Sequence, residues 1–272
     1  MSAPDVTRAH QRVPVDAAWA RDLAVFVRAA IRAVPPPDEI DDQAQAALAA
    51  GYHRDLGLLR YADGAPLDDV RALARRATEY TLALFRLRAP REPWRSADEV
   101  DESLTNSRRA LEALELALAG GAPELATTLA PFVWDPPDAT YIGPTSVVCT
   151  PEEQRLAYAL RDLLTNTPSS EAIRALPDTE WRSAAQRARG WAMVSIAAHD
   201  PIALAVAIEL LREVHAAAVR ARLAETGALD RLDLLLDVPS LAYAALGRAR
   251  LGDVPLRDSD AYFPRALVRD DP

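Results

Sequence analysis

The tripeptide His53-Arg54-Asp55 is the stretch that most resembles a catalytic motif, because protein kinases carry these three residues in their catalytic loop. In kinases the aspartate accepts a proton from the substrate hydroxyl, and an asparagine five residues later holds a metal ion. Here position 60 is an arginine, no glycine-rich loop is readable, and the chain has no lysine to hold phosphates. The triplet is therefore a coincidence.

His199 and His215 are the next candidates, because histidine is a common zinc ligand. They are 16 residues apart on two adjoining helices that we expect to run antiparallel, so a tight turn leaves them far apart. A zinc site needs three or four ligands at defined spacing, and no HExxH or ExxH pattern occurs. We expect both histidines in the core or at its rim, and we expect no metal and no cofactor.

Cys149 is the sole cysteine, so the chain has no intramolecular disulfide and a cytoplasmic location is plausible. It precedes the helix start Thr150-Pro-Glu-Glu153, and a helix N-terminus lowers the pKa of a thiol. No Cys–His–Asn arrangement or Gly-x-Ser-x-Gly elbow can be placed around a nucleophile. An enzyme would also need a deep pocket with converging polar groups, and the sequence indicates none. We therefore expect no enzymatic activity.

Two acidic clusters and two tryptophans are candidates for partner binding. The acids fall where we expect helices to begin, so they are most simply solvated first-turn acids stabilised by the helix dipole. The sharper interpretation is a negative surface that steers in a basic partner. The tryptophans lie in proline-rich loops, either as caps over the core or as exposed interface anchors. These candidates are Asp38, Glu39, Asp41, Asp42, Asp98, Glu99, Asp101, Glu102, Trp94 and Trp134.

The composition excludes several classes of function. The formal net charge is −9, which argues against nucleic acid or an anionic membrane as the main partner. All 31 basic residues are arginines, which excludes a pyridoxal Schiff base, a lysine-dependent P-loop and a Ser–Lys dyad. No secretory signal and no apolar run of about 18 residues is present. We expect a cytoplasmic protein that does not span a membrane.

The apolar pattern predicts an all-α fold without a sheet. Half of the residues are hydrophobic and only 6% are aromatic, and no segment alternates with a period of two. The clearest unit is a helix at Trp191–His199, a restart at Asp200-Pro201, and a second helix. Two helices joined so closely must pack antiparallel. The second helix buries a stripe formed by Leu204, Ile208, Leu211, His215 and Val219.

Other helix starts follow from caps and prolines. We expect residues 1–15 to form a flexible tail and residues 16–272 to form one helical domain, with possible halves 16–134 and 150–272 joined by a proline-rich loop. Recurring helix pairs favour a TPR-like or armadillo-like stack, although no 34-residue consensus is readable. Helices are expected from about Asp16, Asp38, Asp68, Asp98, Pro123, Thr150, Ser170, Asp178, Leu229 and Pro239, with an irregular end from Gly252.

The C-terminal hundred residues resemble the Imm49 immunity proteins. That family ends with an alanine-rich helix, a short Val/Ile-Pro segment and a Ser-x-Tyr-Leu-Pro-x-x-Leu signature. The matching stretches here are Val238–Gly252, Val254-Pro-Leu and Ser259–Leu267, with one extra residue after Ser259 and Phe263 in the leucine position. The hairpin at His199-Asp200, with Ala207, Leu211 and His215, is similar to the family's penultimate helix pair.

This resemblance implies a cytoplasmic protein that binds and neutralises a cognate toxin of a bacterial polymorphic toxin system. It carries no catalytic residues. Because the net charge is negative, we expect the toxin to be basic, for example a nuclease whose substrate face the acidic clusters occupy. A helical-repeat adaptor or regulatory interaction module is the alternative, and a helical enzyme ranks last. The oligomeric state does not follow from the sequence.

Overall fold

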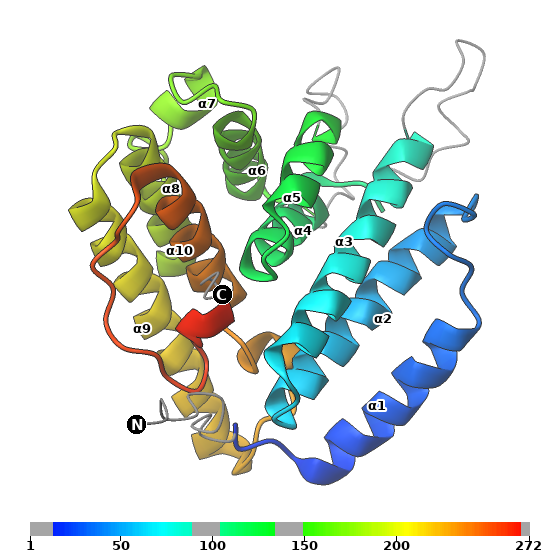
Figure 1. The fold of residues 1–272 in the computed structure, drawn as a ribbon. Coiled ribbons are helices and arrows are strands. Elements are labelled where there is room, and N and C mark those ends of the chain that lie inside the picture. The colour runs from blue at the N-terminus through cyan, green and yellow to red at the C-terminus, as the bar shows by residue number, and fades with distance from the viewer. Residues whose placement is uncertain (1–12, 89–103, 134–148, 268–272) are drawn as a thin grey trace, which may run out of the picture.

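The computed structural model describes residues 13–88, 104–133 and 149–267, and within these ranges the protein is built from helices without a strand (Figure 1). The all-α prediction is confirmed, whereas a TPR-like or armadillo-like packing stays a prediction. The helices are α1 Ala17–Arg32, α2 Gln43–Ala62, α3 Leu67–Arg88, α4 Ser107–Ala119, α5 Pro123–Leu129, α6 Pro151–Leu164, α7 Glu171–Arg174, α8 Ala184–Ala197, α9 Pro201–Thr226 and α10 Val238–Leu251.

Side-chain caps fix most of the helix starts. Thr150 and Glu153 form the predicted capping box, in which the Glu153 amide donates to Thr150 Oγ1 at 3.2 Å and the Thr150 amide donates to Glu153 Oε2 at 2.8 Å. Asp200 caps α9 by accepting hydrogen bonds from the amides of Ile202 and Ala203. These two predicted helix starts are therefore confirmed.

Several predicted helix starts are wrong. Asp38, Glu39 and Asp41 precede α2 and do not form its first turn, because prolines 35–37 hold the chain out of the helical conformation until Asp42 caps the Gln45 amide at 2.7 Å. The helix expected from Asp178 begins at Ala184, where Ser183 is the cap.

The helix expected over residues 229–236 is only the short 3-10 turn Leu232–Leu234. Leu229 exchanges backbone hydrogen bonds with Pro14 and Asp16, and this pairing keeps it extended. The segment after α10 is irregular, as predicted, up to the 3-10 turn Arg265–Leu267. The helix expected from about Asp98 does not run through Leu104, because residues 104–106 are non-helical and α4 begins at Ser107 with Asn106 as its cap. Asp98 itself and most of the proposed tail and loop lie outside the described ranges.

The helices form two groups that α4 joins. In Figure 1, α1, α2 and α3 lie on one side, and α8, α9 and α10 lie on the other. Helix α4 contacts α3, α6 and α10, and thereby joins the two sides. The predicted hairpin of α8 and α9 is confirmed, and α2 and α3 form a second extensive pair.

One continuous core runs through the described residues, from Val13 to Leu267. The predicted stripe of α9 faces it, because Leu204, Ile208, Leu211 and Val219 are buried and His215 is half-buried. The division into two halves remains a prediction. In the ranges given above, no helix is long and apolar enough to cross a membrane.

The irregular C-terminal segment is fixed to the helices by hydrogen bonds. The Asp237 amide donates to the Tyr262 carbonyl at 2.9 Å, and Tyr61 Oη donates to the Ala261 carbonyl. Phe263 and Leu267 are buried in the core. The residues that resemble the Imm49 signature therefore hold the end of the chain against the helices.

Candidate functional site

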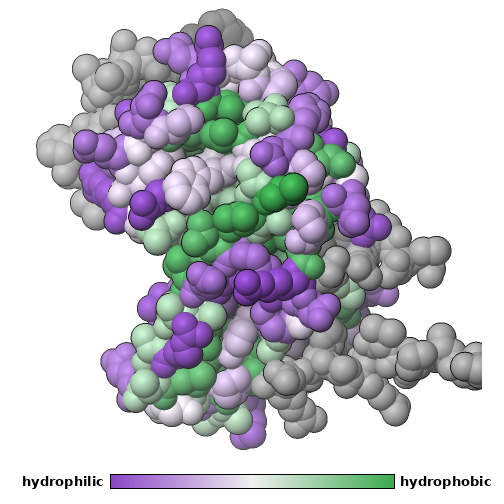
Figure 2. Space-filling model, turned by 90° about the vertical axis from the view of Figure 1, so that its left-hand side faces the viewer, coloured by the Kyte–Doolittle hydropathy of each residue, from purple (hydrophilic) through white to green (hydrophobic). Residues whose placement is uncertain are grey.

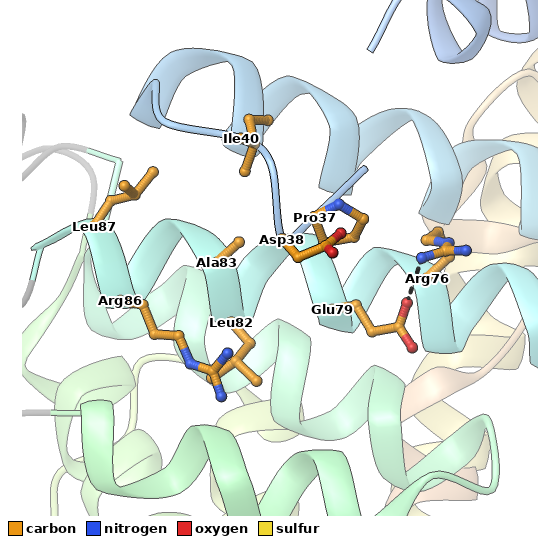
Figure 3. Close-up of a pocket in the computed structure, with 9 residues that line it drawn as sticks. All are labelled: Pro37, Asp38, Ile40, Arg76, Glu79, Leu82, Ala83, Arg86 and Leu87. Carbon is orange, nitrogen blue, oxygen red and sulfur yellow. Dashed lines mark hydrogen bonds and ion pairs between the residues drawn. The ribbon is translucent and has the colours of Figure 1, made fainter. Parts of the chain in front are cut away.

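The acidic segment 38–42 lies at the end of the α1–α2 hairpin. Asp38, Glu39, Asp41 and Asp42 are all exposed, as a solvated or partner-facing cluster requires. Asp38 borders a hollow of about 400 Å³ between this segment and α3. Figure 3 shows Arg76 and Glu79 hydrogen-bonded to one another on the α3 side of this hollow. The wall of the hollow thus carries both signs of charge, while the segment itself is acidic.

The two helices of this hairpin also expose apolar side chains. Val25 and Phe26 of α1 and Leu48 of α2 are more than half exposed, and Phe26 has 58% of its surface accessible. The Phe26 ring meets the Tyr52 ring edge to face, with 5.9 Å between their centroids. We call Val25, Phe26, Leu48 and Tyr52 the hairpin surface. Exposed aromatic and aliphatic side chains bordered by charged residues are typical of protein-binding patches.

A second apolar surface lies on α8 and α9. Trp191, Ile202 and Val206 are exposed there, and Ile202 has 70% of its surface accessible. Figure 2 views this side of the molecule and shows hydrophobic residues gathered in a band between more polar ones. The Arg187 guanidinium lies 5.8 Å from the centre of the Trp191 ring. This second surface is opposite to the buried stripe of α9, so it is not needed for the core.

The remaining partner-binding candidates cannot be placed. Asp98, Glu99, Asp101, Glu102, Trp94 and Trp134 lie outside the described residues. The choice between caps and interface anchors for the two tryptophans therefore remains open.

The expected position in the core or at its rim is confirmed for half-buried His215 and is wrong for His199, which is exposed. His53 is buried, its Nδ1 lies 2.9 Å from the Ala49 carbonyl, and its ring stacks on Tyr80 at 5.0 Å. Burial lowers the pKa of His53, which favours a neutral core histidine. His199 is exposed at the α8–α9 turn, whereas His215 lies roughly 24 Å further along α9. The two histidines are not brought together.

Cys149 is not activated by the helix that follows it. Burial raises the pKa of the Cys149 thiol and outweighs hydrogen bonds that would lower it. The sequence-based argument for a lowered pKa is therefore wrong. The physical reason is that Cys149 is partly enclosed and Glu153 adds a nearby negative charge.

The structure contains a cavity with converging polar groups, which the sequence did not indicate. The polar cavity, as we call it, has a volume of about 630 Å³ and lies among α1, α2, α4, α8, α9 and residues 230–239. Glu115 of α4 is 2% exposed, and its carboxylate receives a hydrogen bond from Arg189 Nη2 at 3.1 Å. Arg189 Nε lies 2.8 Å from Glu115 Oε1, as an ionic contact without hydrogen-bond alignment.

The Glu115 carboxylate also contacts a third helix, α10. Tyr243 Oη of α10 donates to Glu115 Oε1 at 3.1 Å. Burial raises the pKa of Glu115 despite Arg189 and Tyr243, and it also raises the pKa of Tyr243 well above its ordinary value. Glu115, Arg189 and Tyr243 thus form a buried polar network that joins three helices.

Asp237 is the other buried acid of the polar cavity. It is 3% exposed and caps α10, since its Oδ1 accepts the Ser240 amide at 3.2 Å. Its Oδ2 has no hydrogen-bond partner among the described residues, nor do His215 Nε2 and Ser240 Oγ. Burial raises the pKa of Asp237, and the nearby His215 acts in the opposite direction. Sequence reasoning missed Asp237, although an aspartate two residues before Pro239 is a recognisable helix cap.

Comparisons with known proteins add no relative. No family model matches the chain, and no curated protein or solved structure shows a significant similarity to it. The resemblance to the Imm49 proteins consequently rests on the residues quoted above.

Proposed function

We propose that the protein is a non-catalytic immunity protein, which binds and neutralises a cognate toxin of a bacterial polymorphic toxin system. The observation that carries this proposal is the hairpin surface with the acidic segment at its end. Phe26 and Leu48 offer apolar contact area that the fold itself does not use. Asp38, Glu39 and Asp41, in the segment that joins the same two helices, offer exposed negative charge. Apolar contact area combined with exposed charge suits a protein partner of opposite charge.

Electrostatics supports a basic partner. The net charge of −9 and the exposed acids favour rapid association with a positively charged protein, such as a nuclease toxin. Steering of this kind raises the association rate most at low salt. It also acts without a reacting group on the inhibitor.

The buried network favours binding over catalysis. Glu115 is held by Arg189 and Tyr243, so its carboxylate is committed to internal contacts. Cys149 has a raised thiol pKa, which disfavours a nucleophilic thiolate. Within the described ranges, no group of three or more potential metal ligands lies together.

The experiment is a co-expression rescue with the toxin domain encoded nearest to this protein. A sensitive host would express the toxin with the wild type or with a Phe26→Asp/Leu48→Asp variant. We expect the wild type to restore growth and to form a stable complex with the toxin, and the variant to lose both. Ile202→Asp is the matched control, since it places the same charge on the second apolar surface.

A charge variant tests the electrostatic part separately. Asp38→Asn, Glu39→Gln and Asp41→Asn remove these exposed charges while Asp42 is left to cap α2. We expect the association rate to fall about tenfold at low salt and the dissociation rate to change little. An unchanged rate and salt dependence would refute a basic partner at this segment. Rescue without any complex would instead indicate an enzymatic antidote.

The second candidate is a helical adaptor, and the apolar surface on α8 and α9 favours it. An adaptor needs more than one binding face, and Trp191, Ile202 and Val206 provide a second. A folded protein that neither rescues growth nor binds the toxin would favour this alternative. Loss of rescue by Ile202→Asp alone would place the toxin on α9 and remove the hairpin surface from the proposal.

A further inference from the structure

The polar cavity has the size and lining of a small-molecule site. Its volume of about 630 Å³ falls within the range of roughly 300–1,000 Å³ that is usual for ligand pockets. Apolar side chains of four segments form much of its wall, namely Leu58, Leu116, Leu211, Leu232, Leu236 and Val238. Such a wall accommodates an aliphatic chain.

The charged lining of the polar cavity is acidic on balance. Five acids and three arginines line it: Glu112, Glu115, Asp230, Asp233 and Asp237, with Arg54, Arg189 and Arg231. Each of these arginines lies within 4 Å of a carboxylate: Arg54 of Asp55 and Glu112, Arg189 of Glu115, and Arg231 of Asp233. No lining arginine is left over to receive an anion, so the cavity does not select a phosphate or carboxylate.

Four of the five acids also pair with an arginine. Arg108 and Arg54 pair with Glu112, and Arg222 holds Asp230 through two nitrogens at 2.7 and 2.5 Å. Glu115 and Asp233 have the arginines already named. Asp237 differs, because its Oδ2 accepts no hydrogen bond within the described residues and it has no ion pair of this kind there. His215 and Arg189 act on its carboxyl group only through their electrostatic field.

A buried carboxylate oxygen without a donor is destabilising, and a ligand that supplies a charged donor removes this cost. His215 carries the neighbouring Nε2 that also lacks a partner, so a second polar contact is available beside Asp237. The arrangement offers one buried carboxyl acceptor, one imidazole nitrogen and an aliphatic wall.

We propose that the polar cavity binds an organic cation, an alkylammonium or alkylguanidinium group, whose charged end pairs with Asp237 and whose chain lies against Leu116, Leu211 and Leu236. The same chemistry is available in a free small molecule and in a lysine or arginine side chain presented by a partner. This site is separate from the hairpin surface and does not depend on the proposed function.

The test is calorimetric titration of the full-length protein with n-butylguanidinium chloride and n-butylammonium chloride, and with neutral n-butylurea as the matched probe. We expect at least one cation to bind and the urea to bind at least tenfold more weakly. Asp237→Asn keeps the shape and the cap acceptor for Ser240, and it should weaken cation binding at least tenfold. Asp233→Asn changes an exposed acid of the same cavity, and its affinity for the cation should stay within twofold of the wild-type value.

The source of the cation is distinguished by a capped Gly-Gly-Arg-Gly-Gly peptide. Binding of the peptide with the same sensitivity to Asp237→Asn would identify a partner's side chain, and binding of the small cations alone would identify a free ligand. The proposal is overturned if neither cation binds to the wild type, or if Asp237→Asn binds as the wild type does. Equal losses in both aspartate variants would overturn it as well, because they would reflect general charge and not Asp237.

Discussion

Arg189 of α8 and Glu115 of α4 form an ion pair although 74 residues separate them in the sequence. The pair joins α8 to α4, and Tyr243 of α10 adds a third helix through its hydrogen bond to Glu115. A buried ion pair does not by itself stabilise a fold, because desolvation of both charges offsets their attraction. Its consequence is that neither partner can be removed alone without leaving the other charge uncompensated.

Arg189→Met should therefore destabilise the protein strongly. Glu115 would stay buried without its cation, and the expected loss is about 3–5 kcal/mol in the free energy of unfolding. Urea denaturation at neutral pH measures it. The double variant Glu115→Gln/Arg189→Met should lose less than the single variant, since the introduced glutamine side chain is neutral and keeps an acceptor for Tyr243. If the double variant were the less stable of the two, the pair would be a net source of stability.

Asp237→Asn should stabilise the protein near neutral pH. Burial raises the pKa of Asp237 above its unfolded value, so the folded state binds this proton more tightly than the unfolded state does. The corresponding stability is present below about pH 4 and is lost as the pH rises through the folded pKa. The Asp237→Asn variant has no carboxyl group to ionise at this position, so it does not lose this stability as the pH rises. Urea midpoints from pH 3.5 to 7.5 should diverge in its favour, and a constant difference would contradict the raised pKa.

The sequence predicted the helical scaffold well, because caps and apolar periodicity are local signals. The capping box at Thr150 and the restart at Asp200 need no tertiary information. The starts near Asp38 and Asp178 were wrong because acidic residues suit a helix N-terminus without fixing its position. The helix expected at Leu229 is absent because Leu229 pairs through its backbone with Val15. This contact joins residues more than 200 positions apart and leaves no local signal in the sequence.

The polar cavity could not be predicted in this way, since its walls come from six separate segments of the chain. One local clue exists: Glu115 stands between Leu114 and Leu116 on a helix whose neighbouring positions are apolar. A charge at such a position requires a buried partner. Which of the 31 arginines supplies it is a question of packing, and no spacing in the sequence points to Arg189.

Asp260→Asn should loosen the C-terminal segment. Burial would raise the pKa of Asp260, but hydrogen bonds from Arg212 and from the amides of Tyr262 and Phe263 outweigh it and lower the pKa. The resulting stability is present above about pH 4 and is lost as the pH falls through the folded pKa.

The expected loss for Asp260→Asn at neutral pH is about 1 kcal/mol, since the carboxylate is half exposed. Amide hydrogen exchange of residues 254–267 measures this loss locally. The exchange rates of the wild type and the variant should converge in acid. Persistent protection of the variant at neutral pH would mean that buried Phe263 and Leu267 hold the segment without Asp260.

Gly247→Ala should destabilise the packing of α10 against α9. A Cβ at Gly247 would clash with Cδ2 of Leu204, a fully buried side chain, and would also touch Val254. Overpacking of this kind costs roughly 1–3 kcal/mol, which exceeds the gain of about 1 kcal/mol from replacing a helical glycine by alanine. Thermal or urea unfolding measures the balance.

Gly51→Ala is the matched control for Gly247→Ala, because a Cβ at Gly51 of α2 meets nothing within 4 Å. There the helix propensity acts alone, and the protein should gain up to about 1 kcal/mol. Leu204→Ala should lose part of its cost when combined with Gly247→Ala, since the new methyl group enters the space that the leucine leaves. Additive effects of Leu204→Ala and Gly247→Ala would show that the two residues do not share this contact, and the close approach of α9 and α10 at Gly247 would be refuted.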